Sequence, residues 1–405
     1  MANVSSSNGL EKRPKLRFPG FDEPYKQCRI GDIYAERSQR GASDMELLSV
    51  TMNDGVKPRS EIEGKDNSSE DKSNYKIVRK GDMVYNSMRM WQGANGISPC
   101  DGIVSPAYTV LMPKQEINNG YFATLFKSAN LINEFRKNSQ GMTSDTWNLK
   151  YPQIETIKVQ IPSVSEQDKV SEMFSVLDER IAAQSQLVES LKKYKRGLLN
   201  AFFAEKSDYF LLADTYVLKI EEVCDVLSGK RIPKGETFCS HPTEYRYITV
   251  SDMGEKYVCS DNLQYISKHT EKQISRYKVK GGDIIISVAG TLGKLNIITS
   301  DLGGVNLTEN CDRFTNFRGV GSEYLYYVLS SDLIQSQIES SKTKNGQPKL
   351  ALERIRNFTI PVPHQEIQEQ LVKVMISLDQ YIASQLAILD RYCKLRRGLL
   401  QQLFI

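Results

Sequence analysis

The chain has 405 residues, of which 40% are apolar and 25% charged, and a formal net charge of +4 at pH 7. This length predicts two to three domains, each with its own core, and the composition is ordinary for a globular protein. No apolar run approaches the ~18 residues of a membrane span, and residues 1–17 lack the apolar segment of a secretory signal.

The small positive charge permits nucleic acid as a partner without requiring it. Seven cysteines are scattered with no C-x-x-C pair, which predicts reduced thiols and a cytoplasmic location rather than disulfides or a zinc site. The three histidines, His241, His269 and His364, are isolated, so surface or turn positions are favoured over metal ligands and no metal is expected.

Residues 1–20 predict an N-terminal arm that includes the sequence KLRFPGF. Residues 21–162 predict a first β-rich domain. Strands are expected at residues 45–51, on either side of a Gly81-Asp82 turn within residues 75–85, and at residues 154–161, with a short helix over residues 121–135.

Residues 163–206 predict one long helix, about 60 Å in length at about 1.5 Å per residue. Its apolar residues alternate steps of four and three, which is typical of a coiled-coil seam, and no proline interrupts it. The seam positions are Val170, Phe174, Leu177, Ile181, Gln184, Val188 and Leu191.

The same order then returns, with a second β-rich domain over residues 207–362 and a second long helix over residues 363–405. The helices match without a gap at a constant offset (382 − 181 = 201), as Ile181 and Ile382 show. The second seam contains Leu371, Met375, Leu378, Ile382, Gln385, Leu389 and Tyr392. The chain is therefore a tandem repeat, and pairing the two helices within one molecule buries both seams. Gln184 and Gln385 are expected to fix the register, the alternative being solvated helices with one polar seam position each.

No catalytic constellation is evident. Residues 288–294 resemble a phosphate-binding loop only weakly, because the first glycine is missing and Leu295 stands where a hydroxyl would bind magnesium. There is no G-x-S-x-G and no Asn/Asp-Pro-Pro-aromatic tetrapeptide of the adenine methyltransferase kind. The sequence therefore favours a binding module over an enzyme.

The loops between strands are rich in the side chains that contact base edges and phosphates. Candidates in the first domain are Lys57, Arg59, Asn86, Ser87, Arg89, Trp91 and Gln92. Candidates in the second are Lys230, Arg231, Lys234, Thr291, Lys294, Asn306, Asn310, Arg313, Lys342, Lys344, Asn345, Gln347 and Lys349. Any single loop is also compatible with a solvated turn, but the recurrence in two parallel places favours DNA contact.

The KLRFPGF opening, the Gly-Asp turns, the Ile-Pro step before each long helix and the helix ending at residues 191–203 resemble the DNA-specificity subunit of type I restriction–modification systems. The likeness covers nearly all of the chain from about Lys15. It implies an α+β fold with two target-recognition domains joined by two long helices in an intramolecular antiparallel coiled coil, related by a pseudo-two-fold axis. Tyr25 stands where the family often has Trp.

The resemblance also implies a function. Each domain would read one half of a bipartite, asymmetric site in double-stranded DNA, with half-sites about 34–36 Å apart, and the coiled coil would act as a ruler. Two methyltransferase subunits would dock on the helices and restriction subunits would join them. The chain itself would be non-catalytic, and S-adenosylmethionine, ATP and magnesium would bind the partner subunits.

Two other readings stay open at this point: a coiled-coil scaffold whose β domains bind protein, and a self-sufficient methyltransferase or nuclease. Six basic residues near the helix ends also have two interpretations. They could dock partner subunits or steer DNA phosphates, or they could simply interact favourably with the helix dipole. They are Lys192, Lys193, Arg196, Lys394, Arg396 and Arg397.

Overall fold

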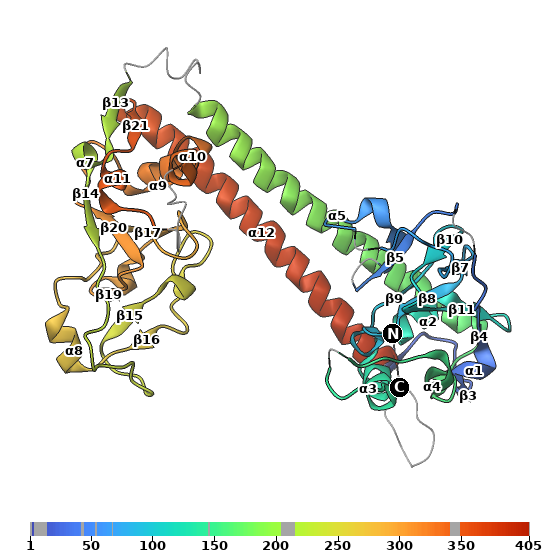
Figure 1. The fold of residues 1–405 in the computed structure, drawn as a ribbon. Coiled ribbons are helices and arrows are strands. Elements are labelled where there is room, and N and C mark those ends of the chain that lie inside the picture. The colour runs from blue at the N-terminus through green and yellow to red at the C-terminus, as the bar shows by residue number, and fades with distance from the viewer. Residues whose placement is uncertain are drawn as a thin grey trace. The chain divides into compact units, whose positions relative to one another are not determined.

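The computed structural model describes residues 2–3, 14–41, 44–52, 55–66, 68–144, 146–203, 215–340 and 349–404. The chain forms two compact units, residues 1–185 with 387–405, and residues 186–386. Two long helices, α5 (Val164–Phe202) and α12 (Gln365–Leu403), each contribute to both units (Figure 1). Each predicted β-rich domain therefore shares its unit with part of both helices.

The first unit is built on a four-stranded antiparallel sheet of order β4-β11-β8-β9. A two-stranded sheet pairs β3 with β12, so the beginning and the end of the domain lie together. Three further strand pairs are β1 with β2, β5 with β6, and β7 with β10. The strands are β1 (Ala2–Asn3), β2 (Leu16–Arg17), β3 (Lys26–Arg29), β4 (Tyr34–Glu36), β5 (Leu48–Thr51), β6 (Gly55–Pro58), β7 (Lys76–Val78), β8 (Met83–Asn86), β9 (Asn95–Ile97), β10 (Gly102–Val104), β11 (Tyr108–Pro113) and β12 (Lys158–Ile161).

Short helices cover this unit, and they correct two sequence expectations. The helices are α1 (Ile30–Ile33), α2 (Asn119–Leu125), α3 (Ala129–Asn138) and α4 (Tyr151–Ile154), with 3-10 turns at Arg59–Glu61 and Met90–Gln92. The single helix expected over residues 121–135 is two, because Ser128 adopts extended backbone and accepts a hydrogen bond from Leu131 N as the N-cap of α3. The strand expected over residues 154–161 begins only at Lys158, because α4 precedes it with Pro152 in its first turn, where proline is tolerated.

The second unit repeats this plan with a sheet of order β14-β20-β17-β18. The pair of β13 with β21 corresponds to that of β3 with β12, and a third sheet has the order β16-β15-β19. The strands are β13 (Tyr216–Lys219), β14 (Asp225–Ser228), β15 (Arg246–Ile248), β16 (Gln264–Tyr265), β17 (Ile284–Ser287), β18 (Leu295–Ile297), β19 (Asn306–Leu307), β20 (Cys311–Thr315) and β21 (Thr359–Val362). The helices are α7 (Ile220–Val223), α8 (Lys268–Gln273), α9 (Ser322–Ser330), α10 (Asp332–Ser340) and α11 (Leu352–Arg356), with 3-10 turns at Val250–Asp252 and Ser300–Leu302.

The tandem repeat extends to single hydrogen bonds. Before β8, Arg79 N donates to Asp82 Oδ2 at 2.8 Å, and before β17, Lys280 N donates to the corresponding Asp283 Oδ2 at 2.8 Å. Gly81, which precedes Asp82, has a φ of 90°, a conformation that favours glycine. The predicted duplication and fold class are thus confirmed.

Two buried glutamines fix the start of each long helix in the same way. Gln167 donates to the carbonyl of Pro162 at 3.0 Å, and Gln368, the equivalent residue of the second helix, donates to that of Pro363 at 2.9 Å. A buried amide needs such a partner. Each proline carbonyl therefore anchors its helix to the strand before it.

The two long helices run antiparallel within each unit. In the first unit, Arg396 from the end of α12 pairs with Asp178 from the first half of α5, with Nε 2.5 Å from Oδ1. In the second unit, Lys195 from the end of α5 pairs with Asp379 from the first half of α12. The two ion pairs are copies of one another, since both partners are related by the offset of the tandem repeat.

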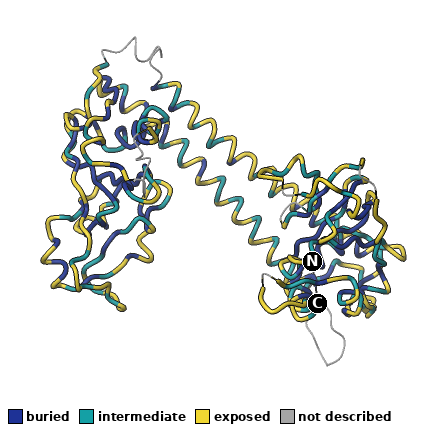
Figure 2. Tube along the Cα trace, viewed as in Figure 1, coloured by how far each residue is buried: buried dark blue, intermediate teal, exposed yellow. Residues whose placement is uncertain are grey.

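Every predicted seam position is at least half-buried, whereas most of the residues between them are exposed (Figure 2). The buried ones are Val170, Phe174, Leu177, Val188, Leu371, Met375 and Ile382, and the half-buried ones are Ile181, Gln184, Leu191, Leu378, Gln385, Leu389 and Tyr392. Within the described parts of the chain, no helix is long and apolar enough to cross a lipid bilayer.

Candidate nucleic-acid interface

In the second unit, three loops leave the same end of the central sheet. β14 ends at Ser228, β17 ends at Ser287, and β20 begins at Cys311. The register pairs Ser228 with Asp312 and Ser287 with Cys311. The loops at residues 229–235, 288–294 and 308–310 therefore start side by side. We call this region the second sheet end.

Backbone hydrogen bonds fix the loops of the second sheet end to one another. Lys230 N donates to Leu307 O at 2.8 Å, and Val288 N donates to Asn310 O at 2.8 Å. Leu350 N donates to Val288 O at 3.0 Å, which adds the segment that begins at residue 349. Because these bonds do not involve side chains, the side chains of the loops are held on a defined backbone.

Glycine is required at the base of this assembly. A Cβ atom on Gly229 would lie 1.9 Å from the carbonyl oxygen of Thr308. No side chain fits that distance, so the close approach of the two loops depends on Gly229.

Most of the predicted residues of the second domain that the structure describes lie at this end and are exposed. They are Lys230, Arg231, Lys234, Thr291, Lys294 and Lys349, together with the half-buried Asn310. Arg231 is 79% exposed, and its Nε lies 2.5 Å from Glu309 Oε1. Desolvation raises the pKa of Glu309, but the hydrogen bond from Arg231 and others outweigh it, so the net shift is downward. Lysine, arginine, amide and hydroxyl groups on one surface have the donors that phosphates and base edges accept.

Three predicted residues lie in the interior instead. Asn306 is 1% exposed and donates to the carbonyl of Ile274 at 2.8 Å. Arg313 is 9% exposed and lies 3.7 Å from Asp283, and Ser87 of the first unit is 4% exposed. In this structure each of the three side chains is buried inside its own domain. Lys342, Lys344, Asn345 and Gln347 lie outside the described residues.

A buried carboxyl group lies beneath the second sheet end. Asp312 is 3% exposed, and its burial raises its pKa to about 6, although a hydrogen bond from Ser228 and the charges of Lys349 and Arg356 act in the opposite direction. Asp312 therefore changes its charge slightly below neutral pH.

The first unit has a corresponding sheet end. Residues 87–94 join β8 to β9 as residues 288–294 join β17 to β18. Arg89 and Gln92 are exposed there, and Trp91 is half-buried with its Nε1 donating to Met88 O at 3.1 Å. Asn86 Oδ1 accepts a hydrogen bond from Met88 N at 3.0 Å. The structure thus brings Asn86, Arg89, Trp91 and Gln92 together at what we call the first sheet end.

Lys57 and Arg59 lie elsewhere, on and after β6. The Arg59 guanidinium donates to the carbonyls of Ile62 at 2.6 Å and Gly64 at 2.9 Å. In this conformation it organises its own loop.

The structure adds two residues that the sequence analysis missed. Trp147 contacts Trp91 edge-to-face with ring centroids 5.2 Å apart, and the Arg136 guanidinium lies 5.6 Å from the Trp147 ring. The only available signal was that the chain has two tryptophans, both outside the helices and strands expected from the sequence. Nothing in the sequence links these two positions, which are far apart along the chain.

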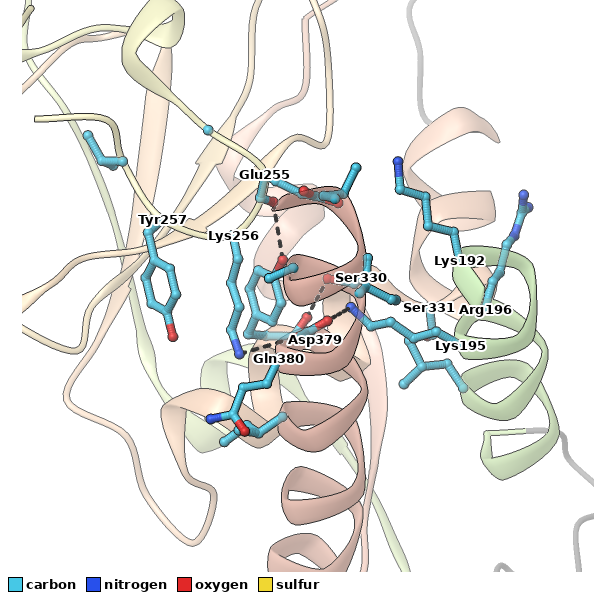
Figure 3. A pocket seen from close by; sticks show the side chains of 18 of the residues that line it. Lys192, Lys195, Arg196, Glu255, Lys256, Tyr257, Ser330, Ser331, Asp379 and Gln380 are labelled. Carbon is cyan, nitrogen blue, oxygen red and sulfur yellow. Dashed lines mark hydrogen bonds and ion pairs between the residues drawn. The ribbon is translucent and has the colours of Figure 1, made fainter. Parts of the chain in front are cut away.

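A pocket of about 870 Å³ lies between α5, α9, α12 and residues 254–259 of the second unit (Figure 3). Asp379 lines this pocket and accepts hydrogen bonds from Tyr327 at 2.6 Å and from Lys195. Lys256 lies 3.4 Å from Asp379 and 4.7 Å from the centre of the Tyr327 ring. Burial, and then the hydrogen bond to Asp379, raise the pKa of Tyr327.

Two of the basic residues proposed for docking, Lys192 and Arg196, line this pocket. Both have acidic neighbours, with Lys192 3.6 Å from Glu189 and Arg196 2.9 Å from Asp332. No group of three or more His, Cys, Asp or Glu residues among the described positions is placed to hold a metal ion.

A family model and individual relatives both match this chain to specificity proteins of type I restriction systems. The family described as "Type I restriction modification DNA specificity domain" matches residues 23–193 and again residues 214–390. The type I restriction enzyme MjaVIII specificity subunit of Methanocaldococcus jannaschii is 24% identical over 324 residues, which cover 76% of this chain and 74% of that protein. The EcoBI specificity subunit of Escherichia coli is 23% identical over 246 residues, which cover 55% of this chain and 52% of that protein.

Two solved structures share the fold. One, from work on complex assembly and conformational transition of the type I R-M system, has a TM-score of 0.62 at 16% identity and covers 96% of this chain and 99% of that chain. The S subunit of the type I restriction-modification system from M. genitalium has a TM-score of 0.58 at 15% identity and covers 97% of this chain and 99% of that chain.

Proposed function

The chain belongs to the family of type I restriction modification DNA specificity domains, and we propose that it is the subunit that selects the DNA site of a restriction–modification complex. It reads a bipartite, asymmetric sequence in double-stranded DNA. The first sheet end reads one half, and the second sheet end reads the other.

One observation carries this proposal. Each unit contains the same four-stranded sheet, and in each unit the clustered loops lie at the same end of that sheet. The side chains of the first sheet end differ from those of the second sheet end. A repeated scaffold supports two equivalent contacts with the duplex, and unlike side chains support two different half-sequences. The buried Ser87, Asn306 and Arg313 position the loops rather than contact bases.

The partners are methyltransferase subunits, of which two bind, and restriction subunits. The repeated ion pairs Asp178–Arg396 and Lys195–Asp379 support two binding events, because they give the helix pair of each unit the same arrangement of charge. The chain is itself non-catalytic and works in the cytoplasm. S-adenosylmethionine, ATP and magnesium bind the partners, which supply the methyl-transfer and motor chemistry.

The test is co-expression of this chain with its methyltransferase subunit in a bacterium that lacks DNA methylation, followed by mapping of methyladenine across the genome. A motif of two unlike halves with a fixed spacer is expected. Exchange of residues 21–162 for another recognition domain should then change one half only. A change in both halves, or no motif from a stably assembled complex, would contradict the proposal.

Single variants test the second sheet end. Arg231→Ala and Lys349→Ala should each weaken binding to the mapped site, and a lost phosphate contact should reduce the slope of log affinity against log salt by about 1. Lys219→Ala is the matched control, because Lys219 lies just before α7, at the opposite end of β14. A scaffold that binds only protein would show no salt-dependent affinity for the duplex.

A further inference from the structure

A loop of the first unit, residues 140–148, lies at the first sheet end. Leu149 N donates to Ser87 O at 2.9 Å, and in the second unit Leu350 N donates to Val288 O at 3.0 Å. Both partners are related by the offset of the tandem repeat, so the loop corresponds to the segment that ends at residue 349. The two sequences differ in kind. The segment at residues 342–349 reads KTKNGQPK, whereas residues 140–148 read QGMTSDTWN and contain no lysine or arginine.

The described residues of this loop, 140–144 and 146–148, have a defined backbone. Gln140 and Asn148 exchange two backbone hydrogen bonds, at 2.9 and 2.8 Å, and Thr146 N donates to Thr143 O at 2.9 Å. Gly141 has a φ of 142°, and a Cβ atom there would lie 2.6 Å from the carbonyl oxygen of Thr146. The turn therefore requires glycine at position 141 and fixes where the next residue is presented.

That next residue is Met142, which is 99% exposed. A single exposed apolar side chain is common on protein surfaces. Met142, however, lies within a loop that is closed by the backbone hydrogen bonds between Gln140 and Asn148. The same loop contains Trp147, which contacts Trp91 and lies under the Arg136 guanidinium. Arg89 and Gln92 are exposed on the adjoining loop.

We propose that Met142 inserts between adjacent base pairs of the first half-site, so that this half is recognised partly through unstacking of the duplex. This inference rests on the proposed function. Apolar side chains that enter a base step unstack it and bend the DNA, and methionine fits irregular gaps because it is unbranched and polarizable. Arg136, oriented by Trp147, carries the positive charge that holds the sugar–phosphate backbone beside the wedge.

The two halves of the DNA site are then recognised through different interactions. The second sheet end binds through cations and amides, with a strong dependence on salt. The contribution of Met142 is apolar and leaves the salt slope unchanged. Flexible pyrimidine–purine steps unstack most easily, so such a step is expected in the first half of the mapped motif.

The experiment uses this chain assembled with its methyltransferase subunits and duplexes that contain the mapped motif. 2-Aminopurine replaces single purines of the first half in turn, other than the adenine that is methylated. Fluorescence should rise at one position with the unaltered chain and with Met142→Leu, which keeps an apolar wedge. Met142→Ala should lose this rise and bind about tenfold to a hundredfold more weakly, with an unchanged salt slope, because the burial of one methionine side chain is lost.

Val217→Ala is the control for loss of an exposed apolar side chain, since Val217 is 62% exposed but lies on β13 of the second unit. It should bind and fluoresce like the unaltered chain. Absence of any rise with the unaltered chain, or a rise that persists in Met142→Ala, overturns the inference. Loss of methyltransferase subunits from the purified Met142→Ala complex would identify Met142 as a protein contact and overturn it as well. Failure of the proposed function is distinguishable, because no motif would be mapped at all.

Discussion

A buried ion pair joins the N-terminal segment to the first turn of α5. The Arg17 guanidinium donates to Glu166 through Nε at 2.9 Å and through a terminal nitrogen at 2.8 Å, and the two side chains are 6% and 1% exposed. Tyr25 adds a hydrogen bond to Glu166 at 3.3 Å, and its ring lies 5.0 Å from the guanidinium. The two-bond geometry is specific to arginine.

Removing one member of this ion pair should lower the free energy of unfolding far more than replacing both members by apolar residues. Arg17→Ala leaves a buried carboxylate without its cation, which costs about 3–5 kcal/mol in comparable cases. The double variant Arg17→Met with Glu166→Leu leaves no buried charge, and such replacements are neutral to within roughly 1 kcal/mol or stabilising. The two changes should therefore be strongly non-additive.

The chain provides its own probe for this experiment. Its two tryptophans, Trp91 and Trp147, both belong to the first unit. Urea unfolding followed by tryptophan emission therefore reports the first unit alone. Arg17→Ala should lower its free energy of unfolding by about 3–5 kcal/mol, and the double variant should recover most of the loss. If the double variant were as unstable as Arg17→Ala, or if Arg17→Ala cost under about 1 kcal/mol, the pair would not be the desolvated contact that its burial indicates.

Three further changes have defined outcomes. Asp312 has a pKa of about 6 in the folded chain against an ordinary value of 3.8, so folding disfavours its ionised form. The free energy of unfolding of the second unit should therefore fall by up to about 3 kcal/mol as the pH rises from 4 to 7. Asp312→Asn should remove this fall, as measured by hydrogen exchange of β20. Gly229→Ala should displace the loops of the second sheet end, so methylation of the mapped site should be lost while the tryptophan emission of the first unit stays unchanged. Gly321→Ala is the control and should keep methylation, because a Cβ atom there meets nothing within 4 Å. Phe174→Ala should cost the first unit about 3–5 kcal/mol in the tryptophan-monitored unfolding, because Phe174 is 1% exposed and stacks on Phe404; a loss below about 1 kcal/mol would contradict the packing described.

Periodicity made the repeat and the helix seams predictable. The spacing of apolar residues by three and four positions can be read from the sequence alone. The second copy of each seam position, at a constant offset, confirms the assignment independently. Local turn chemistry was equally readable, as the Gly81-Asp82 turn before β8 illustrates. The break at Ser128 was missed because the apolar period continues through it, although serine is a common N-cap.

The site was less accessible to sequence reasoning, for a physical reason. Residue type marks a side chain that can contact DNA, but burial decides whether it is free to do so. Arg313 and Arg231 look alike in the sequence, yet one lies in β20 facing Asp283 and the other is 79% exposed. Contacts such as Trp91 with Trp147 depend on long-range packing that no local pattern encodes.

The division of the chain has a consequence for its biosynthesis. Residues 186–386 form one unit without interruption, whereas the first unit needs residues 387–405 to cover Phe174 with Phe404. A ribosome that adds about 5–20 residues per second takes roughly 10–40 s to make the intervening second unit. During that time the apolar face of the first helix stays uncovered while the second recognition domain can already close. The nascent chain therefore has a window in which chaperones, or a second nascent copy, compete for the surface that its own last helix will occupy.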